Sequence, residues 1–451
     1  MIAWVVAVGI GGQLCGALGT DGLSLGGGVG VGVVGADVVS VVELQAGIET
    51  APFSLHLRAP LTLRLLDQAP SVSPASPSWC QAVRCEELLR GQDVDPVVFA
   101  RIVDEIRIFR PGDALHARVG RLTATLGAGA VVDRVTTTAS WDRRTSGAYA
   151  GLRLDQFRAD LVVADVTSPL ELVAGRFELA AVGVPVVVGA EAAADLWAPV
   201  GRADDGSDND DDAGDATRLL ATTSLDVRLP VVLGAFSVAP RLELAGTTGL
   251  LPRDTASAEG GPLVGAGIAG GVDATFRASF LEARALGVVS LGSPGHRRGL
   301  FSTLHLVERR HALAGSVVTG GGLADVPAPG GAGVDLRLDV SLAQVVTTLT
   351  RLHIEHAPGA NAAEVGVVVE LEPVSVSVSA IRRAFVDPAG ILDVDFGERP
   401  LVIAAEAAWR IWGPLSVWAR WYRLPRTRGA ALVFDNDVLA GVALAGVWRP
   451  S

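Results

Sequence analysis

The sequence predicts an all-β fold, a large antiparallel transmembrane β-barrel of about 16 to 18 strands. Three observations predict it: apolar and polar residues alternate along many segments, 49% of the 451 residues are apolar, and no linker divides the chain. A transmembrane helix needs about 20 consecutive apolar residues. Beyond the N-terminus, Arg, Asp, Glu or Pro interrupts every apolar run at short intervals. We therefore expect the apolar residues to lie on strands that cross a membrane.

The clearest alternation lies in residues 53–65, where Leu55 and Leu57 alternate with His56 and Arg58. Successive side chains of a strand point to opposite faces, so one face would be apolar and the other polar. The same pattern recurs in residues 157–163, 225–229, 334–342 and 374–379. Strands of about 9 to 11 residues with one apolar face can cross a bilayer as part of a barrel.

Residues 1–19 are expected to form a signal peptide, which leaves residues 20–451 for the barrel. The segment is apolar and ends in small residues near Ala17 and Gly19. It lacks the basic start of most signal peptides, so a buried first strand is the alternative.

Residues 67–111 interrupt the strand pattern and are expected to form a loop or a plug-like insertion. Within them, residues 97–108 (VVFARIVDEIRI) have the apolar spacing of a short helix. Cys80 and Cys85 lie close together in this insertion, and in an exported protein we expect them to form a disulfide. A metal site would need further ligands nearby.

Two other stretches are expected to be exposed loops, the acidic residues 201–217 and the Gly/Pro-rich residues 320–333. Asp208, Asp210 and Asp212 offer oxygen ligands that would suit Ca²⁺, but they lack the spacing of an EF-hand. A solvated loop is the favoured interpretation.

Aromatic residues concentrate near the C-terminus, on two expected strands joined by a turn at residues 413–414. In a barrel they would form a girdle at the membrane interface; the alternative is a sheet core with cross-strand aromatic pairs. The residues are Trp409, Trp412, Trp418, Trp421 and Tyr422.

The polar faces of the expected strands carry charges of both signs, which in a barrel would point into the lumen. Such charges can line a water-filled passage with basic and acidic walls, or they can cross-link the interior into a closed network. The sequence leaves both interpretations open. The candidates for lining the lumen are Arg58, Arg64, Arg118, Arg158, Asp160, Arg228, Arg337 and Asp339.

Short motifs add no enzymatic chemistry. Residues 30–35 match a dinucleotide-binding pattern and residues 22–26 match a nucleophile elbow, but both are followed by strand-like rather than helical sequence. His353 and His356 would face opposite sides of a strand, too few for a metal site. We expect neither catalytic residues, nor a metal, nor a cofactor. A net charge of −12 argues against nucleic acid as a partner.

The chain closes on an alternating segment that contains Val438, Ala440, Val442, Leu444, Gly446 and Trp448. With the alternation before it, this ending resembles outer-membrane β-barrel proteins, and residues 118–134 look like a segment of uncharacterised porin-like barrels. The resemblance implies the outer membrane of a Gram-negative-type bacterium, insertion by its assembly machinery, contact with lipid and a homo-oligomer as one option. It also implies a channel for small solutes, selected by lumen width and charge.

Two alternatives belong to other classes. An exported soluble or surface β-rich protein with a structural or binding role would need polar outer faces. A barrel enzyme acting on lipid would need a Ser, His and acid with recognisable spacing.

Overall fold

The structure is a computed structural model. It describes residues 22–34, 37–66, 102–110, 112–133, 135–137, 146–167, 171–199, 217–250, 263–296, 298–302, 330–343, 345–355, 361–383, 401–428 and 431–448. All regular structure in these residues is β-strand. Among them, no helix is long and apolar enough to span a membrane.

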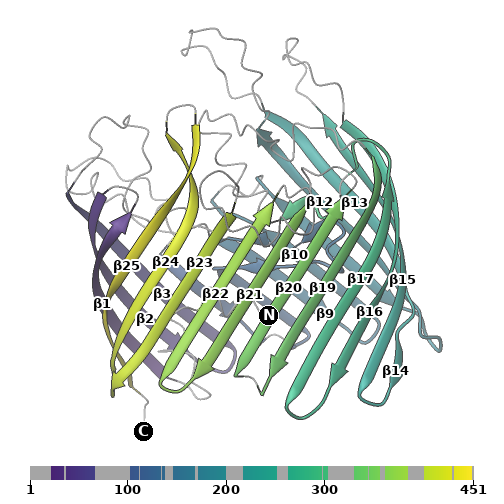
Figure 1. Cartoon of the computed structure of the whole chain (residues 1–451). Coiled ribbons are helices and arrows are strands. Elements are labelled where there is room, and N and C mark those ends of the chain that lie inside the picture. The colour runs from purple at the N-terminus through teal and green to yellow at the C-terminus, as the bar shows by residue number, and fades with distance from the viewer. Residues whose placement is uncertain are drawn as a thin grey trace.

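Most strands belong to a single sheet (Figure 1). In chain order they are β1 (Gly22–Val34), β2 (Asp37–Glu49), β3 (Phe53–Leu66), β4 (Val103–Ile108), β5 (Leu115–Gly120), β9 (Gly147–Arg153), β10 (Phe157–Val163), β11 (Val173–Ala180), β12 (Val187–Pro199), β13 (Thr217–Arg228), β14 (Val231–Leu233), β15 (Phe236–Leu250), β16 (Leu263–Arg277), β17 (Leu281–Gly292), β19 (Gly331–Leu342), β20 (Val346–Glu355), β21 (Ala362–Leu371), β22 (Val374–Arg383), β23 (Leu401–Trp412), β24 (Leu415–Arg428) and β25 (Ala431–Trp448). Two small sheets pair β6 (Thr123–Ala124) with β8 (Val135–Thr136), and β7 (Val132–Asp133) with β18 (Phe301–Ser302).

The large sheet closes on itself. Strand β1 pairs antiparallel with β2 on one side and with β25 on the other, from Leu23 opposite Trp448 to Val34 opposite Asp437. Since β13 and β14 both pair with β15, they are one interrupted strand, and the barrel has 20 strands. The predicted class is confirmed, with a count above the expected 16 to 18, in part because β4 lies in the stretch interpreted as an insertion. Closure leaves no unpaired sheet edge.

The two ends of the barrel differ. The turns at residues 50–52, 154–156, 234–235 and 413–414 are short and lie at one end, the lower end in Figure 1, which we call the short-turn end. Strand β1 begins there and β25 ends there. At the other end, which we call the long-loop end, β3 ends and β4 begins, and β12 ends and β13 begins, with much longer stretches of sequence between them. Short turns at one end and long loops at the other are typical of bacterial outer-membrane barrels.

The alternation read from the sequence separates the two faces of the wall. On β19, Leu336 and Leu338 point outward and are nearly half exposed, whereas Asp335 between β17 and β20 is 4% exposed. Leu242 and Leu244 of β15 are likewise exposed on the outside. A band of large exposed apolar side chains over the outer wall is unusual for a soluble protein and suits contact with lipid.

Two connections fold into the barrel, residues 121–137 after β5 and residues 293–302 after β17, and we call them the inner segments. Leu122, Leu126 and Leu300 from these segments form one buried cluster with Val162 and Leu220 from the inner face of the wall. The segments also hold each other, because β7 pairs parallel with β18 and the Gly299 N–H donates to the Ala130 carbonyl at 2.7 Å. They therefore fill part of the interior against strands β10 to β13, and Ala128 and Arg298 extend these contacts to β15, β16, β17 and β19.

Part of the expected insertion is wall instead. Residues 103–108 form β4, which pairs with β3 and β5, so the expectation of a short helix is wrong for these residues. Glu105 and Arg107 face the interior while Ile106 and Ile108 face outward, which is the period of a strand. The chain that enters the interior is the inner segments. Residues 67–101 with Cys80 and Cys85, the expected signal peptide, and residues 201–216 with the Asp208 to Asp212 candidates lie outside the described residues.

Candidate functional site: the charged inner face of the barrel

The structure places the expected lumen-lining residues on the inner face. Arg58 on β3 lies beside Glu43 of β2, with Nη2 2.7 Å from Oε2. Arg337 and Asp339 alternate with the outward Leu336 and Leu338 of β19. Arg118, Arg158, Asp160 and Arg228 occupy the corresponding inward positions of β5, β10 and β13. The backbone of Arg64 lies opposite Val39, and its side chain is outside the described part.

Ion pairs join many inward charges into one continuous series across β11, β13, β15, β19 and β20. We call this series the inner charge network. Its links are Arg228 to Glu178 (2.6 Å), Glu178 to Arg176 (2.8 Å), Arg176 to Asp226 (2.7 Å), Asp226 to Arg241 (3.7 Å), Arg241 to Glu243 (3.4 Å), Glu243 to Arg298, Arg298 to Asp335 (2.8 Å) and Asp335 to His353 (2.7 Å). Arg298 is the only link that comes from an inner segment among the described residues.

The inner segments cover this network. A Cβ added to Gly127 would lie 2.6 Å from Nη1 of Arg176, so the backbone passes directly over the guanidinium. The Val132 N–H donates to Oε1 of Glu191 at 2.8 Å, and Arg298 donates to the Ala128 carbonyl at 3.4 Å. Side chains of Arg176, Asp226, Arg241, Glu243 and Arg298 are at most 3% exposed. The sequence left open whether the inward charges line a water-filled passage or cross-link the interior. In this part of the wall they form a closed, cross-linked network.

A second set of inward charges lies on the other side of the barrel. Glu43 contacts Arg58 and also Nη1 of Arg420 at 3.5 Å. Arg420 lies 3.9 Å from Glu406, and the Tyr422 hydroxyl donates to the same Glu406. Strands β2, β3, β23 and β24 are thereby linked through their inner faces.

The expectation of an aromatic girdle is wrong for two of the five residues. Trp418 and Tyr422 are buried on the inner face of β24, at the positions that alternate with outward residues. Trp418 instead stacks on Arg420, whose Cζ is 4.5 Å from the ring centroid. Trp409 and Trp412 are more than half exposed on β23 near the turn at 413–414, and Trp421 lies opposite the exposed Val438.

Trp418 also explains a glycine motif. Its ring lies against β1 and β25, where a Cβ added to Gly30 or to Gly441 would approach ring carbons to 2.6 Å. Gly30 is thus needed for close packing, and residues 30–34 continue a strand. Ser24 of the other glycine motif lies in the same strand and donates to the Gly47 carbonyl.

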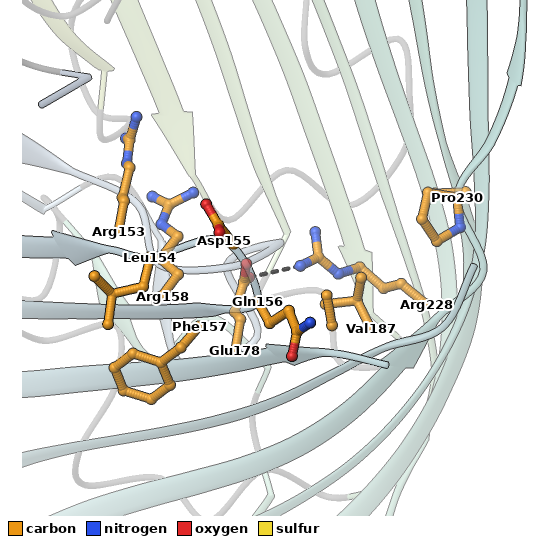
Figure 2. Close-up of a pocket in the computed structure, with 12 residues that line it drawn as sticks. Arg153, Leu154, Asp155, Gln156, Phe157, Arg158, Glu178, Val187, Arg228 and Pro230 are labelled. Atoms are coloured by element: carbon orange, nitrogen blue, oxygen red, sulfur yellow. Dashed lines mark ion pairs between the residues drawn. The ribbon is translucent and has the colours of Figure 1, made fainter. Parts of the chain in front are cut away.

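Charges that keep contact with the open interior lie nearer the short-turn end. Arg284 of β17 is 51% exposed and pairs with Asp273 at 2.5 Å, and Arg158 of β10 is 42% exposed and pairs with Asp160 at 2.7 Å. A pocket of about 280 Å³ opens beside Arg158, between the 154–156 turn, Glu178 and Arg228 (Figure 2).

Several of these residues were not identified from the sequence. Arg176 and Glu178 alternate with Phe177 and Leu179, so a period-two signal was present. Arg298 lies outside any strand, and its partners come from strands distant in the sequence. In the described part of the chain, no three His, Cys, Asp or Glu side chains are grouped as metal ligands would be; His353 binds Asp335.

No protein-family model and no curated protein matches this chain. Its matches among solved structures include several outer-membrane porins and the FrpB iron transporter from Neisseria meningitidis, which is 8% identical over 96% of this chain and 83% of its own, with a TM-score of 0.36. Pseudomonas aeruginosa OccK2, solved with glucuronate, is 12% identical over 94% of this chain and 98% of its own, with a TM-score of 0.33. Acinetobacter baumannii OccAB2 is 8% identical over 95% and 98%, with a TM-score of 0.35. A BenF-like porin from Pseudomonas fluorescens is 10% identical over 94% and 98%, with a TM-score of 0.33. Likeness at this level transfers neither a substrate nor a residue role.

Proposed function

We propose that this protein is a porin-like channel in the outer membrane of a Gram-negative-type bacterium, which passes small solutes selected by lumen width and charge. The observation that carries the proposal is the closed 20-strand barrel with an apolar outer face and a charged inner face. Only helices and closed barrels satisfy every backbone hydrogen bond within a membrane. Barrels of 16 to 18 strands already enclose water-filled channels.

We propose that the inner segments narrow this channel on one side. They lie against strands β10 to β19 and bury the middle of the inner charge network, from Arg176 to Asp335, so those charges act in holding the segments rather than in meeting solutes. The charges proposed to meet solutes are the more exposed ones, above all Arg158 and Arg284. Insertion by the assembly machinery and homo-oligomerisation stay predictions from the resemblance to outer-membrane barrels.

The two alternative functions would each require features of the barrel wall that differ from those of a channel. A soluble β-rich protein would have to cover the exposed Leu, Val and Phe side chains of the outer face, and lipid does so directly. A lipid-cleaving barrel would need a Ser hydroxyl and a His that lipid can reach. Ser24, the candidate offered by a glycine motif, has His56 on the other side of Gly47, but it is 2% exposed on the inner face and donates to the Gly47 carbonyl.

The test is conductance of the purified, refolded protein in a planar lipid bilayer, with ion selectivity read from the reversal potential in a salt gradient. Stable current steps are expected. Insertion without conductance would show a barrel closed by its own segments, and failure to insert would favour the soluble alternative.

A further inference from the structure

Three arginine side chains lie at the short-turn end of the interior. Arg153 closes β9, Arg158 lies near the start of β10, and Arg228 ends β13. All three line the pocket of about 280 Å³ beside the 154–156 turn. In Figure 2 the side chains of Arg153 and Arg158 extend in the same direction from this turn, and Arg228 points toward Glu178.

The pairing of Arg153 with Arg158 is unfavourable by itself. The two residues are directly opposite each other in the β9–β10 pair, and like charges directly opposite destabilise a sheet. Arg153 is exposed and forms no ion pair within the described residues. A bound anion would relieve this repulsion, because it would interact favourably with both guanidinium groups.

The acidic partners lie behind the arginines. Asp160, which holds Arg158 through Nε, is 2% exposed while Arg158 is 42% exposed. Glu178 binds Nη2 of Arg228 and Nε of Arg176 and is less exposed than Arg228. These carboxylates orient the guanidinium groups and leave them facing the pocket, where planar donors match carboxylate and phosphate oxygens.

We propose that this pocket binds a small oxyanion, a carboxylate or phosphate group of a solute, at the short-turn mouth of the barrel. The proposal deepens the proposed channel function and rests on it for the route of the solute, while the binding step itself can be measured without a membrane. Asp155 lines the same pocket with an exposed carboxylate, which opposes an anion and sets its affinity.

The experiment is calorimetric titration of the refolded full-length protein in detergent with inorganic phosphate and, separately, with malonate, at constant ionic strength. Saturable binding of at least one probe is expected. Arg153→Gln should weaken it roughly tenfold, as loss of a hydrogen bond to a charged group does, and Asp155→Asn should strengthen it. The control is Arg410→Gln, because Arg410 lies near the same end on β23, is 41% exposed and pairs with Glu372.

Each outcome of the titrations either supports or overturns the oxyanion site. Binding that falls with Arg153→Gln and not with Arg410→Gln supports the site, and the preferred probe identifies phosphate or carboxylate as its ligand. No saturable binding, or equal loss in the two variants, overturns the site. A protein that conducts without binding refutes this proposal alone, whereas one that binds without conducting refutes the channel and leaves the site intact.

Discussion

Arg298 offers a direct test of whether the inner segments restrict the channel. Its side chain is 3% exposed and bridges Glu243 and Asp335, which lie on β15 and β19. The variant Arg298→Ala removes this bridge and leaves two buried carboxylates with one cation fewer. We expect residues 293–302 to lose their anchor on the wall and to leave the interior more often.

The magnitude follows from the partners that remain. Breaking a buried ion pair from one side costs about 3 to 5 kcal/mol. Glu243 keeps Arg241 at 3.4 Å and Asp335 keeps His353 at 2.7 Å, so the lower figure, about 3 kcal/mol, applies. That free energy shifts the equilibrium between docked and released segments by roughly 100-fold.

The assay is single-channel recording in a planar bilayer. Circular dichroism, which measures β-sheet content, and heat-dependent gel migration establish that the barrel is folded. Arg298→Ala should raise the conductance or the frequency of large open events. The matched control is Arg298→Met combined with Glu243→Gln and Asp335→Asn, which removes the stranded charges and should bring the current back toward that of the native protein. A folded Arg298→Ala protein with native conductance and native noise would refute a restricting role for the segments.

Three further predictions test other parts of the structure. Arg284→Glu should move the reversal potential toward cation selectivity, since this side chain is half exposed inside the barrel. Gly30→Val should destabilise the barrel by about 1 to 3 kcal/mol in urea unfolding, because its Cβ meets the Trp418 ring at 2.6 Å; Gly270→Ala, whose Cβ has open space to 4.0 Å, is the neutral control. In variants that keep a single tryptophan, brominated lipid should quench the fluorescence of Trp412, on the outer face, more than that of Trp418.

The barrel itself was predictable because its cause is local. Alternation of Leu336 and Leu338 with Asp335 and Arg337 is a property of consecutive residues, and burying charge inside while leaving leucine outside requires nothing beyond the strand period. The expected helix over residues 97–108 failed where local signals compete. Ile102 and Ile106 are four residues apart, a spacing that places both on one face of a helix and equally on one face of a strand. Hydrogen bonding to β3, which is distant in the sequence, makes residues 103–108 a strand.

The aromatic assignments failed for a reason that the sequence did contain. Trp418 and Tyr422 share their parity on β24 with Ser416 and Arg420, both buried on the inner face. Composition alone, aromatic residues near a turn, suggested a girdle, whereas parity with polar residues would have separated the inner pair from Trp409.

The inner segments could not be predicted in the same way, because their position depends on tertiary contacts. Residues 121–137 have no sustained period. Gly127 lies over Arg176, whose guanidinium is held by Glu178 on the same strand, Glu191 on β12 and Asp226 on β13. The same buried charges that look from the sequence like the lining of an open pore are thereby used up in attaching chain to wall. Selectivity in this barrel is then expected from the few charges that the attachment leaves exposed, and these lie toward the short-turn end.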